Sequence, residues 1–176
     1  MARSPTALSP VEAERELAFA QLDPLTVTKL WGNPCWLSFR LNFISFGFND
    51  PVYRWIETRY GLVRPEFGAL YAVGLREGVA AKNIVASTGL PKNTLSRAIQ
   101  KLLQRRLLRR EVDPEDMRSF VLYLTPAGRA IFDEAMPVML KQQAAMLAPL
   151  SKAEQKQLCQ LMDKLIVGSP DWPTEP

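Results

Sequence analysis

Hydrophobic side chains recur at intervals of three and four residues along most of this chain, which is the spacing of one face of an α-helix. Ser9–Glu12 and Ser151–Glu154 have the Ser-x-x-Glu form of a capping box at a helix start. The chain is therefore expected to be mainly α-helical. The predicted helices cover residues 10–22, 24–31, 35–60, 65–75, 81–88, 92–105, 126–146 and 152–166.

The segment from Cys35 to Phe48 differs from the other helical segments because apolar residues occupy most of its faces. A helix of this kind is expected to be buried on more than one side. Asn49–Pro51 permits a kink, after which the helix continues to Tyr60.

Two short segments, Leu107–Val112 and Ser119–Leu124, read as strands, the second with alternating side chains. The polar turn Asp113–Asp116 joins them into a hairpin. Before the hairpin come a short helix, a glycine turn at residues 89–91 and the longer helix at 92–105. This order predicts a winged helix-turn-helix, a mainly α fold with a small β-hairpin wing.

Basic residues are concentrated in this same part of the chain. The segment from Lys92 to Arg110 has seven of them and no acidic residue, whereas the whole chain has a net charge of only +4. Such a stripe attracts phosphates and releases counterions, which favours DNA binding over the alternative of a merely solvated helix face. The seven residues are Lys92, Arg97, Lys101, Arg105, Arg106, Arg109 and Arg110.

The first residues of a recognition helix reach base edges in the major groove. Arg97 suits a bidentate contact with guanine, and Asn93 suits adenine. Thr94 and Ser96 suit bases or phosphates. The predicted contacts from this region are Lys92, Asn93, Thr94, Ser96, Arg97, Lys101 and Arg110.

Composition excludes several other classes of function. The chain has no histidine, and its two cysteines, Cys35 and Cys159, are too few and too far apart for a disulfide framework or a zinc site. No enzymatic activity, catalytic group, metal or cofactor is expected. No apolar run is long enough to span a membrane, and no secretory signal is recognisable, so a cytoplasmic protein is expected.

The sequence "IVASTGLPKNTLSRAIQKLLQRRLLRR" resembles the helix-turn-helix of the MarR family of transcriptional regulators, and "DPEDMRSFVLYLTPAG" resembles its wing. The resemblance extends more weakly over about residues 36–166. It implies that Arg118 enters the minor groove and that Asp116 braces this arginine. One departure is Arg106, which stands where the family usually has glycine.

The resemblance also implies a homodimer that binds a palindromic operator on double-stranded DNA. In this arrangement residues 1–60 and 129–167 supply dimerisation helices, residues 61–128 form the DNA-binding domain, and residues 168–176 are a disordered tail. The stripe at 158, 161, 162, 165 and 166 suits a dimer surface, although it is equally suited to packing within one subunit.

MarR-like proteins often release DNA when a small anionic aromatic compound binds, so a repressor of this type is the leading hypothesis. A carboxylate suits Arg40 or Arg64 while aromatic rings hold the ligand. Aromatic residues at helical spacing are, however, also typical of a core. The expected ligand-binding residues are Trp36, Phe39, Arg40, Phe43, Tyr53, Arg64, Phe67 and Tyr71.

Cys35 supports an alternative, a thiol-based regulator that senses oxidative stress. It lies near a predicted helix start, where a thiol pKa is lowered. Peroxide-sensing relatives have a Tyr one turn later, whereas this chain has Phe39. A plain role as a small apolar residue is the other interpretation.

Overall fold

The computed structural model describes residues 20–114 and 116–172. The capping box at Ser9–Glu12 and nearly all of the helix expected over 10–22 lie outside these residues. The chain forms two compact units, residues 1–47 and 48–176, whose boundary falls within one long helix.

The first unit contains α2 (Pro24–Trp31) and the first half of α3 (Trp36–Tyr60). Asp23 caps α2 by accepting a hydrogen bond from the backbone N–H of Thr26. Arg40 joins the two helices, since its Nε donates to the Leu30 carbonyl at 2.8 Å. Its guanidinium also lies over the rings of Trp31 and Trp36, at 5.6 and 5.1 Å from their centroids.

The expectation that the first half of α3 is buried on more than one side is wrong for the single chain. Its large apolar side chains are exposed by fractions that run from 37% at Phe39 to 63% at Phe46. Composition indicates that a helix face is to be covered, but it does not indicate whether the same chain covers it. The exposed residues are Trp36, Leu37, Phe39, Leu41, Phe43, Ile44 and Phe46.

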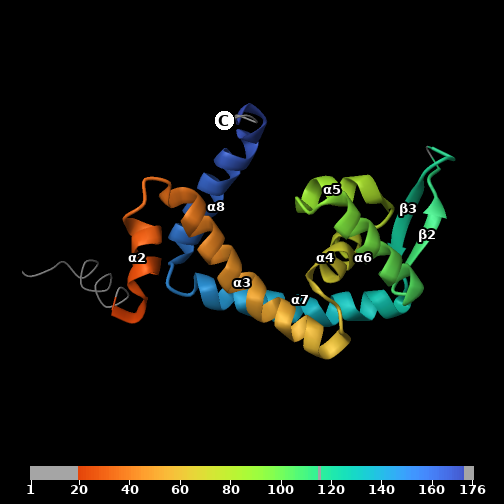
Figure 1. Ribbon diagram of the computed structural model, residues 1–176, viewed down its shortest axis with the longest axis horizontal. Helices are drawn as coiled ribbons and strands as arrows, with labels where there is room; N and C mark the ends of the chain where they lie inside the picture. The colour runs from red at the N-terminus through yellow and green to blue at the C-terminus, as the bar shows by residue number, and fades with distance from the viewer. Residues whose placement is uncertain (1–19, 115, 173–176) are drawn as a thin grey trace, which may run out of the picture. The chain divides into compact units, whose positions relative to one another are not determined.

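The second unit begins within α3 and contains the remaining elements, of which Figure 1 labels the α-helices and the strands β2 and β3. A three-stranded antiparallel sheet has the order β1-β3-β2. The elements are α4 (Arg64–Leu75), β1 (Val79–Ala80), α5 (Ala81–Thr88), α6 (Lys92–Gln104), β2 (Leu108–Val112), β3 (Phe120–Leu124), α7 (Pro126–Leu147), α8 (Lys152–Val167) and the 3-10 helix η1 (Ser169–Asp171).

The core of this unit is built around α4. Phe67, Leu70 and Val73 are buried, and they share one apolar cluster with Leu95 and Leu102 of α6. Gly74 permits α7 to pack closely, because a Cβ at this position would lie 2.2 Å from the Phe132 ring. This core fixes α6 against α4 and leaves the opposite face of α6 exposed.

These elements confirm the predicted fold, a mainly α protein with a small β wing, and they correct some details. The two-residue strand β1 pairs with β3 and was not predicted, because two residues are too few to show an alternating pattern. Residues 169–171 form a 3-10 helix within the segment expected to be disordered. Leu75, the last residue of α4, is 62% exposed.

α3 also continues through Pro51 as one helix, although proline removes a backbone donor there. None of the helices in the described part of the chain is long and apolar enough to cross a membrane.

Arg106 ends α6 in a left-handed conformation, with φ at +56°. Its N–H donates to the Leu103 carbonyl at 3.0 Å, and the Leu107 N–H donates to the Leu102 carbonyl at 2.9 Å. This is a Schellman motif, in which glycine is favoured because it has no Cβ. Here the motif forms with an arginine, at a cost of about 1 kcal/mol.

We therefore expect Arg106→Gly to stabilise the protein by up to about 0.5 kcal/mol, because relief of about 1 kcal/mol of left-handed strain outweighs the greater entropy of glycine in the unfolded chain, which costs at least about 0.5 kcal/mol. The unfolding midpoint should rise by about 2–4 °C per kcal/mol. Arg106→Ala removes the same charge but keeps the Cβ, so it should give no rise. An equal rise in both variants would contradict the argument from backbone strain.

Candidate nucleic-acid interface

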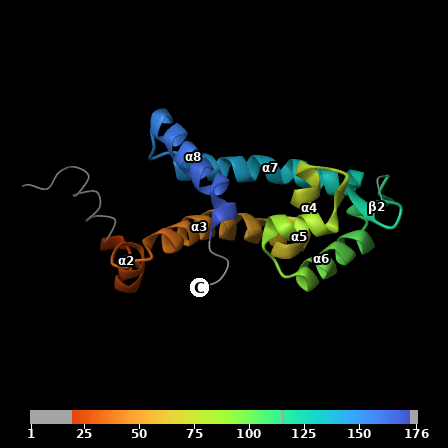
Figure 2. The same ribbon diagram turned by 90° about the horizontal axis from the view of Figure 1, so that it is seen from above.

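α5, a glycine turn and α6 form the helix-turn-helix, and Figure 2 shows α5 beside α6. Gly89 ends α5 with φ at +64°, a conformation that glycine adopts without strain. α6 begins at Lys92 and buries Leu95, Ala98 and Leu102. Its opposite face is therefore presented to solvent.

Four side chains of this exposed face border one surface hollow of about 420 Å³. Asn93, Ser96 and Arg97 were predicted from the sequence, and Gln100 was not. Gln100 lies one turn after Ser96 and two turns after Asn93, so helical spacing alone was a sufficient signal. All four side chains have hydrogen-bonding groups of the kind that read base edges.

The other predicted residues at the start of α6, Lys92 and Thr94, are also exposed. Arg97 has no ion pair or hydrogen bond with another of the described residues. Its guanidinium is therefore available for a ligand as far as the described part of the chain extends.

The basic stripe is less uniform than the sequence suggested, because part of it is used to hold the fold together. Lys101 Nζ lies 2.9 Å from Oε1 of Glu66, whose side chain is only 6% exposed. Arg105 donates to the backbone carbonyls of Tyr60 at 2.6 Å and Gly61 at 3.1 Å. These two cations position α6 on α3 and α4, which corrects the expectation that the whole stripe faces phosphates.

Glu66 is a residue that sequence reasoning missed. It stands at the third position of α4, and its Oε2 accepts a hydrogen bond from the Val63 N–H at 3.3 Å. One buried carboxylate thus caps α4 and binds Lys101 of α6. The signal was available, since a Glu soon after a proline at a helix start is typical of a cap.

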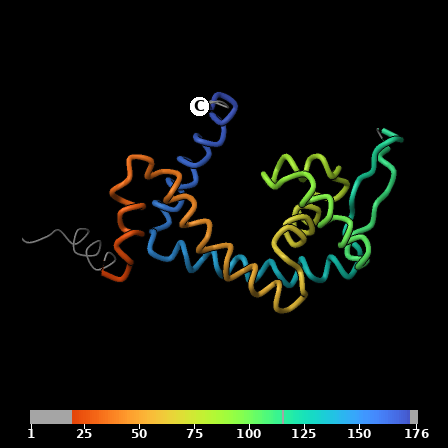
Figure 3. The backbone as a smooth tube through the Cα atoms, viewed as in Figure 1, coloured from red at the N-terminus to blue at the C-terminus, as the bar shows by residue number. Residues whose placement is uncertain are grey.

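β2 and β3 form the wing, a hairpin that extends away from α6 (Figure 3). Arg110 lies over the Phe120 ring with its Cζ 4.8 Å from the centroid. Arg109 lies over Tyr123 at 4.5 Å and also pairs with Glu111. The aromatic rings hold both arginines along the wing.

Asp116 organises the tip of the wing. Its Oδ1 accepts a hydrogen bond from the Arg118 N–H at 3.0 Å, and its Oδ2 accepts one from Ser119 Oγ. The bonds from Ser119 and from the Arg118 N–H lower the pKa of the Asp116 carboxyl, with a smaller contribution from the charge of Lys82. Asp116 therefore braces the backbone of Arg118, and no ion pair joins it to the guanidinium among the described residues.

The wing motif is completed by Thr125 and Gly128, at the start of α7. Thr125 Oγ1 donates to the Arg106 carbonyl at 2.7 Å and accepts from the Gly128 N–H at 3.1 Å. A Cβ on Gly128 would lie 2.1 Å from the Leu107 carbonyl oxygen. The Leu-Thr-x-x-Gly pattern thus fastens α7 to the junction between α6 and the wing.

Comparison with known proteins places this site in a family. A MarR family sequence profile matches residues 60–119, which include α4, the helix-turn-helix and the wing as far as the residue before β3. The transcriptional regulator HosA of Escherichia coli O111:H- is 28% identical over 119 residues, covering 68% of this chain and 88% of HosA. The regulator BilQ of Clostridium symbiosum is 30% identical over 101 residues, covering 56% of this chain and 70% of BilQ.

The chain belongs to the MarR family. A crystal structure of a MarR family regulator from Silicibacter pomeroyi is similar with a TM-score of 0.67 and 29% identity, covering 74% of this chain and 88% of that one.

Two solved structures share the MarR fold at lower identity, and their bound molecules are known. A regulator from Listeria monocytogenes, in complex with a 26-mer DNA, has a TM-score of 0.68 and 17% identity, covering 75% of this chain and 87% of that one. A MarR family protein of Mycobacterium tuberculosis, in complex with salicylic acid, has a TM-score of 0.58 and 22% identity, covering 73% of this chain and 95% of that one.

The predicted ligand-binding residues of this MarR protein fall into two groups. Trp36, Phe39, Arg40 and Phe43 belong to the first unit, where Arg40 is held by the Leu30 carbonyl and two tryptophan rings. The other four residues belong to the second unit.

In the second unit, Arg64 lies over the Tyr53 ring with its Cζ 5.3 Å from the centroid. Tyr53 meets Phe67 edge-on at 6.1 Å, and Tyr71 stacks on Phe132 at 5.6 Å. Phe67 is only 2% exposed and belongs to the core, which corrects the expectation that it contacts a ligand. Its edge-on contact with Tyr53 helps to position that ring.

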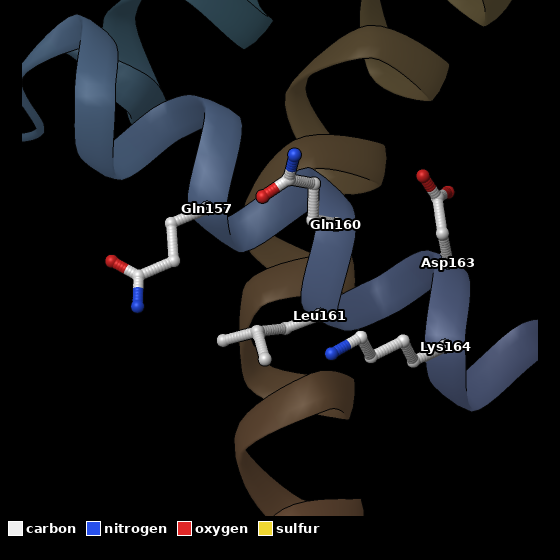
Figure 4. Close-up of a pocket in the computed structure, with 5 residues that line it drawn as sticks. All are labelled: Gln157, Gln160, Leu161, Asp163 and Lys164. Carbon is white, nitrogen blue, oxygen red and sulfur yellow. The ribbon is translucent and has the colours of Figure 1, made fainter.

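Other candidate sites are weaker. A hollow of about 580 Å³ on α8 is bordered by five side chains, of which Lys164 is the one basic group (Figure 4). Cys35 and Cys159 are exposed free thiols in different units. No group of three or more Cys, Asp or Glu within residues 20–114 and 116–172 could hold a metal ion.

Proposed function

We propose that this MarR-family regulator is a homodimeric repressor that binds a palindromic DNA site and releases it when a small aromatic carboxylate binds. In this proposal residues 61–128 bind DNA, and residues 1–60 and 129–167 associate with a second copy of the chain. The observation that carries it is the row Asn93, Ser96, Arg97 and Gln100 on the exposed face of α6, next to a wing with Arg118.

The DNA contacts proposed here follow from the positions of these groups. The exposed face of α6 reads base edges, and a bidentate arginine contact discriminates between bases by about 1–3 kcal/mol. Arg118, at the tip of the wing, suits a narrow minor groove, where negative potential is concentrated. Lys92 and Arg110 supply phosphate contacts. The DNA complex of the Listeria regulator supports the proposal through the shared fold.

The dimer is supported by apolar surfaces that the single chain leaves uncovered. The first half of α3 exposes the seven large apolar side chains described above, and α8 exposes a stripe of its own. Contiguous apolar patches of this kind mark protein–protein interfaces. The α8 stripe consists of Leu158, Leu161, Met162, Leu165 and Ile166, which are 39–62% exposed.

The effector is proposed to place its carboxylate on Arg64 and its ring against Tyr53 and Tyr71. Arg64 is exposed, and no ion pair within the described residues occupies it. A guanidinium that lies over an aromatic ring offers both charge and apolar surface to such a ligand. The salicylic acid complex of the Mycobacterium protein supports this class of effector.

DNA binding is tested by selecting duplexes from a randomised library with the wild-type protein. The proposal predicts an enriched palindrome whose half-sites have centres about 34–36 Å apart, or a multiple of this distance. It also predicts that the logarithm of the binding constant falls steeply with the logarithm of salt concentration, by about 0.9 per phosphate neutralised. Absence of enrichment, together with weak binding at every salt concentration, would refute the proposal.

We expect salicylate to raise the unfolding midpoint of the free protein and to weaken its binding to the selected duplex, because a ligand preferring the free form opposes DNA. Arg64→Ala should weaken salicylate binding by about 10- to 100-fold, the value of a lost charge-assisted hydrogen bond.

Two controls accompany this test. Arg54→Ala removes another exposed arginine, one that pairs with Asp50 of its own helix, and should leave salicylate binding unchanged. Salicylamide, which lacks the carboxylate, should not stabilise the wild-type protein. Equal stabilisation by both compounds would contradict a role for Arg64.

A further inference from the structure

Met117 lies at the tip of the wing, between Asp116 and Arg118, with 78% of its surface exposed. This exposed fraction is matched by Val167 and exceeded by no other large apolar residue in the described chain. An unbranched apolar side chain of this kind adapts readily to an irregular surface. Its position beside the arginine proposed to enter DNA makes it a candidate for direct contact with the same ligand.

The tip that presents Met117 is closed by hydrogen bonds. The Ser119 N–H donates to the Asp116 carbonyl at 2.8 Å, which closes a four-residue turn with Met117 and Arg118 at its centre. The Asp113 N–H donates to the Ser119 carbonyl at 2.9 Å, and the Asp116 carboxylate holds the Arg118 N–H. The two side chains are therefore presented together at the centre of one hydrogen-bonded turn.

Apolar surface continues from the tip along the wing. Val112 and Phe120 are directly opposite each other on β2 and β3, and they are 44% and 48% exposed. Arg110 lies over the Phe120 ring. Contacts with phosphates alone would not use this exposed apolar surface. Duplex DNA, which has phosphates outside and stacked apolar bases inside, offers a surface for both the arginines and the apolar side chains.

We propose that Met117 is an apolar wedge that enters the minor groove beside Arg118 and partly unstacks one base step. This inference rests on the proposed DNA binding of the wing. Wedges of this type kink the duplex, and the cost of the kink depends on the step. Flexible TA and CA/TG steps unstack most readily, so Met117 confers a preference for such a step under the wing without hydrogen bonds to its bases.

The test compares Met117→Ala and Met117→Leu with the wild-type protein on the duplex that the wild-type protein selects. Met117→Ala should bind at least about 10-fold more weakly, because about two buried methylene groups on a single wing already have this value, and Met117→Leu should bind nearly as well as wild type. Because no phosphate contact is lost, the salt dependence should stay the same in both variants. The side chain is exposed, so the unfolding midpoint should not change.

Two further measurements identify the wedge. 2-Aminopurine placed at the step under the wing should become more fluorescent with wild-type protein than with Met117→Ala. Replacing the flexible step by a stiffer one should weaken DNA binding by the wild-type protein. It should leave DNA binding by Met117→Ala nearly unchanged. Leu75→Ala, which removes exposed apolar surface from α4, is the matched control and should match wild type in each measurement.

Unchanged affinity and fluorescence in Met117→Ala would overturn the wedge, and so would an affinity loss accompanied by a smaller salt dependence. The latter would mean that the turn around Arg118 had been damaged. Arg118→Ala, measured beside it, separates this failure from failure of the proposed function. If Arg118→Ala weakens binding and Met117→Ala does not, the wing binds DNA without a wedge.

Discussion

Replacing Leu161 with Glu is expected to turn the protein into a monomer that no longer binds a palindromic duplex specifically. Leu161 is 51% exposed and lies within the apolar stripe of α8. In the single chain the new carboxylate faces water, so the monomer should remain folded. In the proposed dimer it becomes buried without a partner, which costs a few kcal/mol in each copy.

The loss of DNA binding follows from the loss of the second half-site. One helix-turn-helix makes too few contacts for specific binding, whereas a symmetric dimer places two recognition helices on the same face of the duplex. We expect the dimer dissociation constant to rise by at least about 100-fold, as judged from about 3 kcal/mol lost at the interface. Affinity for the selected palindrome should fall towards that for random duplex.

Sedimentation equilibrium and a titration of the selected duplex measure both effects. Gln160→Glu is the matched control, because it adds the same charge to the same helix about 100° further round and outside the stripe. It should remain dimeric and bind DNA like the wild type. A Leu161→Glu protein that stays dimeric would show that the α8 stripe is not part of the dimer surface.

The helix-turn-helix and wing could be predicted closely from the sequence because their signals are local. The helix expected over 92–105 is observed as Lys92–Gln104, and the predicted strands differ by one residue from Leu108–Val112 and Phe120–Leu124. The departure at Arg106 could be noticed because the resemblance places glycine at this position. Its φ of +56° shows that Arg106 itself adopts the left-handed conformation.

Burial was harder to predict, because it depends on which element covers a face. Apolar residues occupy most faces of the segment 35–48, which indicated a buried helix. Phe46 is nevertheless 63% exposed in the single chain. The roles of individual charges were equally hidden. Lys101 and Arg105 belong to the basic stripe by composition, but one binds Glu66, 35 residues earlier, and the other caps the end of α3. Such long-range contacts produce no periodic pattern in the sequence from which they could be predicted.

Arg118→Ala is expected to weaken binding to the selected duplex by about 100-fold while leaving the fold intact. A charge-assisted contact contributes about 1.5–3 kcal/mol, and a dimer has two wings, so a loss of about 3 kcal/mol is a lower estimate. The tip itself should persist, because Asp116 holds the backbone N–H of residue 118 and not its side chain.

The salt dependence distinguishes this role from a general loss of positive charge. If each Arg118 replaces counterions at one phosphate, the slope of log K against log salt should become shallower by about 1.8 for the dimer. Preference for a narrow, A·T-rich minor groove should weaken at the same time. Arg76→Ala, which removes an exposed arginine after α4, is the matched control and should lower affinity only slightly. If both variants lose affinity equally, the wing contributes charge alone, and the minor-groove role of Arg118 is wrong.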